Sequence, residues 1–181
     1  FKYHYHIIPI GGNSFKIIID LDEPLPEEWI GKVGFNLELF PGDLFGRSYL
    51  MDDRTGIFPL QAVGPMTSNK NDALTRPLAS GYKLVIAPEK DRQRLTISSE
   101  NQPLELRDGR SNHNNGWFIV RSTIASNATM GAIDWTITPN VIPDWTYSPV
   151  IQVSQLGYHP DQQKIAVVEI DPTISEYMDF K

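Results

Sequence analysis

The chain has 181 residues, of which 40% are hydrophobic, so it can bury a sizeable core and is too apolar for a disordered protein. Its formal charge of -6 and the lack of any Lys- or Arg-rich run exclude nucleic acid from the expected partners. The absence of cysteine excludes disulfides, thiolate catalysis and cysteine-based zinc sites, and no apolar run approaches the roughly 20 residues that span a bilayer.

Short segments with strand character follow one another along the chain. They are rich in β-branched and aromatic residues, often alternate between apolar and polar, and are separated by turn residues. Helical periodicity is almost absent. We therefore predict an all-β fold, an antiparallel β-sandwich, with strands at residues 3–10, 15–21, 32–40, 83–87, 94–98, 104–106, 117–124, 132–138, 150–154 and 164–170.

Three connections between these strands carry a structural prediction. Gly12-Asn13 is typical of a hairpin turn, because both residues tolerate positive φ. The Pro-Glu-Glu-Trp sequence at 26–29 resembles the first turn of a helix. Residues 41–77 are rich in Gly, Pro, Asp and Asn and only weakly patterned, which predicts a long loop, and loops of this length tend to be functional or mobile.

A domain boundary is predicted near residue 140. Residues 139–149 carry three prolines, and proline favours extended backbone at its own position and the one before it. We expect a β-sandwich at 1–140, a stiff connector at 141–149 and a further β segment at 150–181. That last segment has about 32 residues, too few for a core of its own.

The carboxylates are the first candidates for chemistry, since a glycosidase needs two of them roughly 5 to 10 Å apart. Most lie in turn sequences such as Met51-Asp52-Asp53-Arg54, where their side chains bond nearby backbone N–H groups. Glu38 differs because it sits inside an apolar strand, where alternation places it opposite Leu37 and Leu39, facing solvent or a neighbouring domain. We predict no catalytic residue among them.

The histidines suggest no cofactor. His4 and His6 are two residues apart, hence on one strand face, a spacing that can chelate a metal. No third ligand is implied, so we expect a surface pair on an edge strand, with no metal site and no cofactor.

The four tryptophans are candidates for carbohydrate binding, because the C–H face of a sugar ring packs on an indole ring. Trp29, Trp117 and Trp145 are the candidate platform residues, with the core or an interface as the alternative for each. Trp117 shares a strand face with Ile119 and Arg121. Trp145 lies in the connector, where it can wedge between domains, and Trp135 shares a face with Ile133 and Ile137, which favours the core.

One segment resembles a known family. Residues 150–160, Val-Ile-Gln-Val-Ser-Gln-Leu-Gly-Tyr-His-Pro, and then Lys164-Ile165-Ala166-Val167-Val168, look like the first two strands of the immunoglobulin-like domain that precedes the catalytic barrel in many family 9 glycoside hydrolases. Residues 35–46, together with 108–110 and 114–118, look like an extra N-terminal β-module ahead of such a domain. The resemblance implies a truncated immunoglobulin-like domain at 150–181, with the catalytic barrel and its acidic residues C-terminal to Lys181.

The expected function follows from this resemblance. We expect a non-catalytic N-terminal module of an exported, bacterial, cellulase- or endoglucanase-like enzyme, with a structural or substrate-orienting role. Its expected partners are the catalytic domain of the same parent chain and polysaccharide. The start at Phe1, without a signal region, is read as an excised or processed product in an extracytoplasmic location. Two alternatives stay open, a carbohydrate-binding module and a stand-alone structural or adhesion protein.

Overall fold

The computed structural model describes residues 1–62, 66–69, 72–111 and 116–172. It is 45% strand with almost no helix, which confirms the all-β prediction. The chain forms two compact units, Phe1–Val141 and Ile142–Lys181. The described residues contain no helix long and apolar enough to cross a membrane. Their helices are three single 3-10 turns, η1 (Glu27–Trp29), η2 (Pro41–Asp43) and η3 (Gly109–Ser111).

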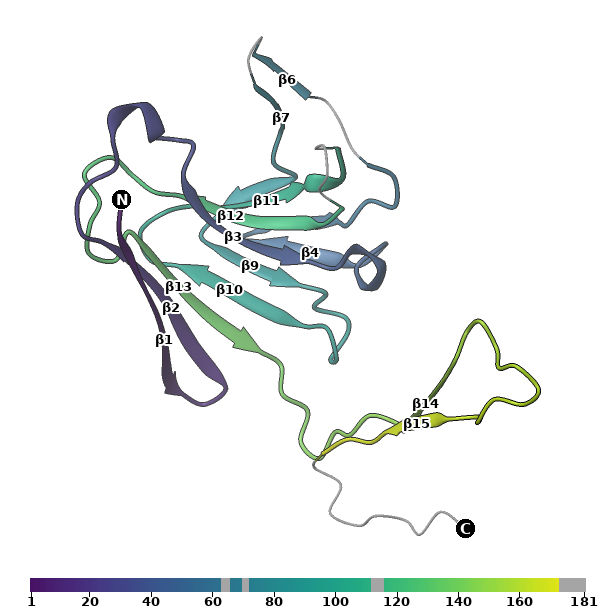
Figure 1. The fold of residues 1–181 in the computed structure, drawn as a ribbon. Helices are drawn as coiled ribbons and strands as arrows, with labels where there is room; N and C mark the ends of the chain where they lie inside the picture. The colour runs from purple at the N-terminus through teal and green to yellow at the C-terminus, as the bar shows by residue number, and fades with distance from the viewer. Residues whose placement is uncertain (63–65, 70–71, 112–115, 173–181) are drawn as a thin grey trace. The chain divides into compact units, whose positions relative to one another are not determined.

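The first unit is a sandwich of two antiparallel sheets (Figure 1). The larger sheet has seven strands in the order β1 (Tyr3–Gly11), β2 (Ser14–Leu21), β13 (Ile133–Pro139), β10 (Leu95–Ser99), β9 (Lys83–Ile86), β4 (Ser48–Met51) and β5 (Arg54–Ile57). The smaller sheet has four, in the order β3 (Gly34–Leu39), β12 (Phe118–Thr123), β11 (Leu104–Asp108) and β8 (Ala79–Gly81). A separate pair joins β6 (Met66–Asn69) to β7 (Asp72–Thr75).

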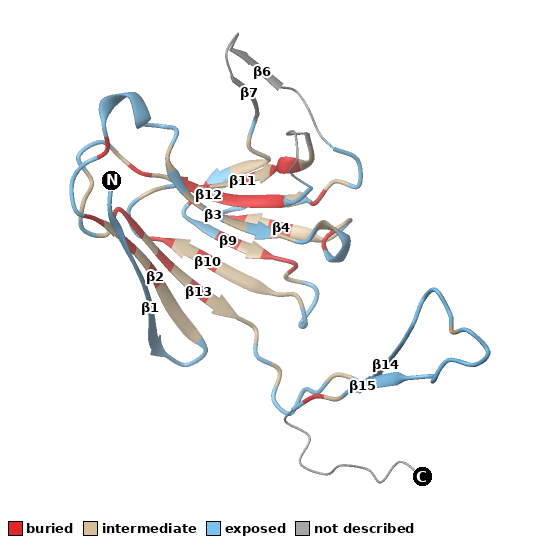
Figure 2. Cartoon of the chain, viewed as in Figure 1, coloured by how far each residue is buried: buried red, intermediate tan, exposed pale blue. Residues whose placement is uncertain are grey.

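The core lies between the two sheets, because alternate side chains of a strand point to the same face and can be turned inward. Figure 2 shows buried residues on strands of both sheets. Trp135 on β13 is fully buried, which confirms its predicted core position. Its ring packs edge-on against Phe35 of β3, with centroids 5.0 Å apart, and so joins the two sheets. Phe58 and Phe118 make a second such contact, at 4.9 Å.

The prediction of one long loop at 41–77 is wrong. This stretch contains η2 and four strands, two of which, β4 and β5, extend the larger sheet. The apolar alternation in this stretch is short, since only Tyr49 and Met51 are buried on β4. Asp52-Asp53 forms the predicted turn and joins β4 to β5 in a tight hairpin. The Asp52 carboxylate then accepts a hydrogen bond from the Lys83 N–H at 2.8 Å, which ties the turn to β9.

Two smaller predictions, a hairpin turn and a helical turn, are confirmed. The turn between β1 and β2 lies at Gly12-Asn13, although the positive φ values fall on Gly11 and Gly12 rather than on Asn13. The helical turn expected after Pro26 is η1, a 3-10 turn that ends at Trp29.

Strand β1 is the edge of the larger sheet and is exposed along its whole length (Figure 2). Tyr3 and Tyr5 pair with Leu21 and Ile19 of β2, which are buried, so both tyrosines lie on the core-facing side of the sheet. They are nevertheless 61% and 46% exposed, because the smaller sheet has only four strands and leaves this margin uncovered.

The second unit is built on one hairpin. β14 (Val150–Val153) pairs with β15 (Ala166–Glu169), in agreement with the two strands predicted there, and together they form a two-stranded sheet. The Tyr147 hydroxyl donates a hydrogen bond to the Ile170 carbonyl oxygen at 2.9 Å, and the Tyr147 N–H donates to the Asp171 carboxylate at 3.1 Å. Two contacts therefore link the residues that flank the hairpin.

Candidate functional site

Two exposed aromatic rings meet at one end of the four-stranded sheet. β3 and β12 pair up to Leu39 and Phe118, so the next residues, Phe40 and Trp117, lie opposite each other. Their ring centroids are 5.5 Å apart and their planes meet at 60°. Phe40 is 58% exposed and Trp117 is 39% exposed. This pair, which we call the platform, includes one of the predicted candidates, Trp117.

The local sequence holds Phe40 in place from both sides. Leu39 packs against the core and Leu44 is buried in it. Between them, η2 is closed by a hydrogen bond from the Leu44 N–H to the Pro41 carbonyl oxygen at 3.0 Å. A Cβ atom at Gly42 would lie 2.7 Å from Cε1 of Phe40, so the ring rests on the backbone of η2. The glycine is what allows this close approach.

Charged side chains cover the outer face of the sheet beyond the platform. Arg107 forms an ion pair with Glu105 at 2.8 Å, and Arg121 Nη2 donates to the Lys32 carbonyl oxygen at 2.6 Å. Burial, and then the neighbouring Arg107, lower the pKa of Arg121. Ile119 points to the same face and is only 6% exposed. At the end of the sheet where the platform lies, the exposed aromatic rings are those of Phe40 and Trp117.

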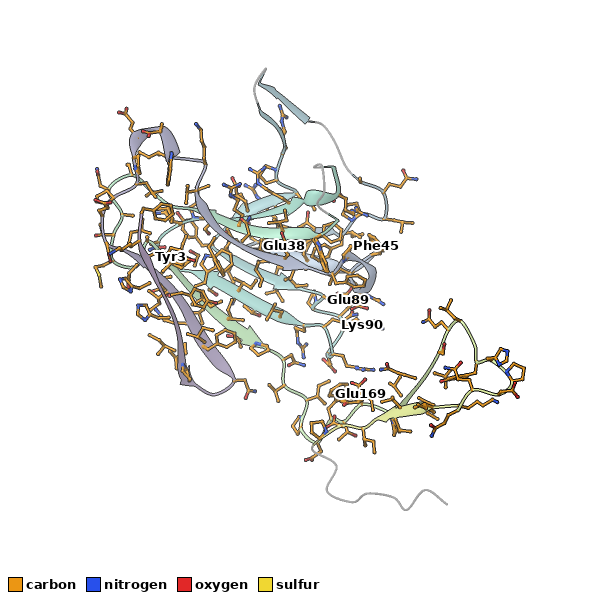
Figure 3. All side chains as sticks on the ribbon, viewed as in Figure 1. Tyr3, Glu38, Phe45, Glu89, Lys90 and Glu169 are labelled. Atoms are coloured by element: carbon orange, nitrogen blue, oxygen red, sulfur yellow. The ribbon has the colours of Figure 1, made fainter. Side chains whose placement is uncertain are left out.

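A groove continues from the platform along the neighbouring loops. A hollow of about 230 Å³ is lined by Phe40 itself, with the polar residues Glu38, Asp43 and Gln93 and the apolar residues Leu39, Leu44, Ile86 and Leu95. A second hollow of about 660 Å³ is lined by Asp43, Arg47, Glu89, Lys90, Asp91, Arg92 and Gln93. Asp43 and Gln93 line both, so we treat the two as one groove. Figure 3 shows Glu38 on β3 and Glu89 and Lys90 on the loop after β9.

The charges in the larger hollow balance. Three carboxylates and three cations line it, together with the amide of Gln93. The Ser48 N–H donates to Glu89 Oε1 at 2.9 Å, and this hydrogen bond is the main cause that lowers the pKa of Glu89. Arg94, beside the groove, holds Asp91 at 2.7 Å. The groove is thus polar but close to electrically neutral.

Two buried polar atoms of groove residues lack a hydrogen-bond partner within the described part of the chain. They are the Arg47 Nε and the Gln93 Oε1. One is a donor and the other an acceptor. Buried polar atoms of this kind are rare in folded proteins, and an ordered water is their usual partner.

The other two predicted tryptophans lie elsewhere. Trp29 ends η1, before β3 begins, whereas Phe40 follows β3. Its ring lies 5.3 Å from that of Phe1, which in turn lies 6.2 Å from Tyr3, so Trp29 joins a separate aromatic cluster at the β1 margin. Trp145 belongs to the second unit, 45% exposed, with its ring 6.5 Å from that of Tyr147. Trp29 therefore lies apart from the platform, and Trp145 belongs to the other unit.

The two N-terminal histidines lie on one face of the exposed edge strand β1, as predicted. Each pairs with an aspartate, His4 with Asp22 at 2.8 Å and His6 with Asp20 at 3.2 Å. Among the residues that the structure describes, no three His, Asp or Glu side chains are grouped to hold a metal ion.

Phe40, Arg47 and Gln93 were not singled out as site residues from the sequence. The alternation that exposes Glu38 also exposes Phe40, two residues later, and this was the available signal. The sequence carries no such signal for Arg47 and Gln93, because each lies outside any periodic segment and lines the groove only through tertiary packing. No family model, curated protein or solved structure matches the chain.

Proposed function

We propose that the chain is a non-catalytic accessory segment of an exported polysaccharide-degrading enzyme of the cellulase or endoglucanase kind, and that its sandwich binds glycan. The observation that carries this proposal is the platform. Phe40 and Trp117 are both exposed, yet each is held by paired backbone or by a buried neighbour. Fixed aromatic rings at the surface offer a large apolar area at low entropic cost, which suits the C–H face of a sugar.

The surroundings of the platform support a carbohydrate ligand over an apolar one. Glu38, Asp43 and Gln93 line the hollow beside Phe40. Carboxylate and amide oxygens accept hydrogen bonds from sugar hydroxyls, and the amide also donates to them. A binding site with an apolar surface and a few placed polar groups is the usual composition for a small ligand.

The proposal assigns no catalysis to this chain. Hydrolysis requires one carboxyl group as acid and a second as base or nucleophile. Several carboxylates are engaged in structural contacts, such as Asp52 with the Lys83 N–H and Asp108 with Arg110. Glu38 and Asp43 are the pair that lines the hollow by the platform, so they are the residues a hydrolytic activity would use. The catalytic domain of the parent chain is the proposed partner.

Affinity electrophoresis of the intact chain in gels containing hydroxyethylcellulose, mixed-linkage β-glucan or xyloglucan tests the binding. We expect retardation, and loss of it in Trp117→Ala, since removing a central aromatic anchor typically costs at least about tenfold in affinity. Tyr82→Ala is the matched control, because Tyr82 is 51% exposed and lies outside the platform and groove. Unretarded migration in every gel would refute glycan binding.

A hydrolysis assay with the same polysaccharides tests the non-catalytic assignment. We expect no release of reducing ends. Measurable hydrolysis that Glu38→Gln abolishes would replace the proposal with an enzymatic function at this site.

A structural or adhesion role is the second candidate, and the second unit favours it. Its hairpin exposes apolar side chains on both faces, among them Ile151 at 68% and Val167 at 59%. Exposed apolar surface of this extent marks a site that contacts another protein surface. Glycan binding by the sandwich would count against a purely structural chain, whereas its absence would favour this second role.

A further inference from the structure

The two rings of the platform are too steeply inclined for a flat ligand surface. Their planes meet at 60°, with the centroids 5.5 Å apart. A planar array of sugar chains, such as the face of a crystal, contacts several rings at once only when those rings lie in one plane. One ring of this pair can lie flat on such a face, but the other then meets it steeply. The geometry favours a ligand that changes direction between the rings.

The groove offers a path for such a ligand beyond the platform. Phe40 belongs to both, since it contacts Trp117 and lines the smaller hollow. Asp43 and Gln93 connect this hollow to the larger one. A chain that stacks on Trp117 and Phe40 can therefore continue past Gln93 toward Arg47. The combined site is longer than a pair of rings.

The polar lining of the groove matches the chemistry of sugar hydroxyls. Asp43 and Gln93 line both hollows; a carboxylate accepts hydrogen bonds, whereas a side-chain amide both donates and accepts them. A hydroxyl group also donates and accepts, so sugar hydroxyls in the groove can pair with both side chains.

The charge of the groove distinguishes between classes of glycan. Three carboxylates and three cations line the larger hollow, and Glu38 adds a further carboxylate beside Phe40. Cation-rich surfaces favour acidic glycans, because unlike charges attract. A groove without excess positive charge favours a neutral chain.

From these observations we infer that the site binds single, soluble chains of neutral glycan, which run from Trp117 across Phe40 into the groove, and that it does not bind crystalline glycan. The inference rests on the proposed glycan-binding function and specifies its substrate class. It assigns Gln93 to the part of the site that contacts sugars beyond the platform.

Isothermal titration of the intact chain with cellohexaose and cellobiose tests the path. We expect cellohexaose to bind at least about tenfold more tightly, because only the longer chain reaches both the platform and the groove. Gels containing hydroxyethylcellulose should retard the chain, whereas polygalacturonate gels and sedimented microcrystalline cellulose should not retain it. Equal affinity for the two oligosaccharides, or retention on microcrystalline cellulose, would overturn the inference and leave glycan binding intact.

Gln93→Leu tests the groove by itself. We expect it to weaken cellohexaose binding several-fold with little effect on cellobiose, while Trp117→Ala weakens both. Gln61→Leu is the control, since Gln61 is exposed and outside the groove. Asp43→Asn gives an independent measurement should Gln93→Leu fail to fold, because Asp43 also lines both hollows, and it should weaken cellohexaose binding with little effect on cellobiose. Cellohexaose binding unchanged in Gln93→Leu would refute the groove path, whereas absence of binding to every glycan would refute the proposed function itself.

Discussion

Trp135 Nε1 donates a hydrogen bond to Ser122 Oγ at 3.1 Å in the centre of the sandwich, where both residues are fully buried. The Ser122 hydroxyl in turn donates to the Pro103 carbonyl oxygen at 2.9 Å. One hydroxyl group therefore forms hydrogen bonds with a tryptophan N–H of the larger sheet and with a backbone carbonyl oxygen beside the smaller sheet. This polar contact joins the two sheets inside an otherwise apolar core.

Ser122→Ala should destabilise the first unit by about 1–3 kcal/mol. The substitution leaves the Trp135 N–H and the Pro103 carbonyl oxygen buried without their partner, and that is where the cost arises. Urea unfolding followed by tryptophan fluorescence measures it. Ser98→Ala, on the half-buried outer side of β10, should change the free energy of unfolding by less than about 0.5 kcal/mol. Equal effects for the two substitutions would contradict the assigned role of Ser122.

Arg110→Met should be more damaging, by about 3–5 kcal/mol, because it leaves the carboxylate of Asp108 buried without its cation. Asp108 is 1% exposed and binds Arg110 through two contacts of 2.8 Å. The guanidinium also lies 4.9 Å and 4.8 Å from the ring centres of Phe45 and Phe118, and it donates to the Pro59 carbonyl oxygen.

The double variant Asp108→Asn/Arg110→Met separates the charge from the packing. It should recover part of the lost free energy of unfolding, since the buried charge is gone. A double variant as unstable as the sum of the two single variants would show that the ion pair is not the source of the effect. Arg54→Met, at an exposed position on β5, is the control for loss of a surface arginine.

Glu89 should stabilise the first unit at neutral pH and lose this effect in acid. The Ser48 N–H lowers the pKa of Glu89 in the folded chain, so folding favours the ionised carboxylate. Because the pKa of Glu89 is lower in the folded chain, its ionised carboxylate stabilises the fold at pH values above the ordinary glutamate pKa of about 4.3. This stabilisation is lost as the pH falls through the pKa of the folded state. Urea midpoints should therefore be higher for the native chain than for Glu89→Gln at pH 7, with the difference shrinking at pH 3. A difference that is independent of pH would contradict this linkage.

Most strands of the sandwich could be predicted because apolar and polar residues alternate along them. Alternation located β3 and placed Glu38 opposite Leu37 and Leu39, which is what the structure shows. Alternation failed for β4 and β5, which have only four residues each and a hairpin rich in Asp and Gly. In such short strands, pairing with β9 rather than local pattern decides the structure.

The platform could be predicted only in part, for a related reason. The strand face of Trp117 follows from the period, and the register agrees. Its contact with Phe40 depends on the register between β12 and β3, which are far apart in sequence, so no local pattern contains it. The groove adds loops from two sheets, and the positions of Arg47 and Gln93 follow from the packing of those loops alone.

The hairpin of the second unit should show little protection from hydrogen exchange. β14 and β15 pair only with each other within the described residues, and their side chains are all exposed. A two-stranded sheet of this kind is marginally stable in water, whereas β10 and β13 are each paired on both sides in the larger sheet. Mass-spectrometric exchange of the dilute monomer should show β14 and β15 exchanging orders of magnitude faster than those central strands. Equal protection in a monomer would mean that the hairpin is stabilised by contacts beyond its own ladder. Protection that rises with protein concentration would instead show that its exposed edges and faces pair with a second copy.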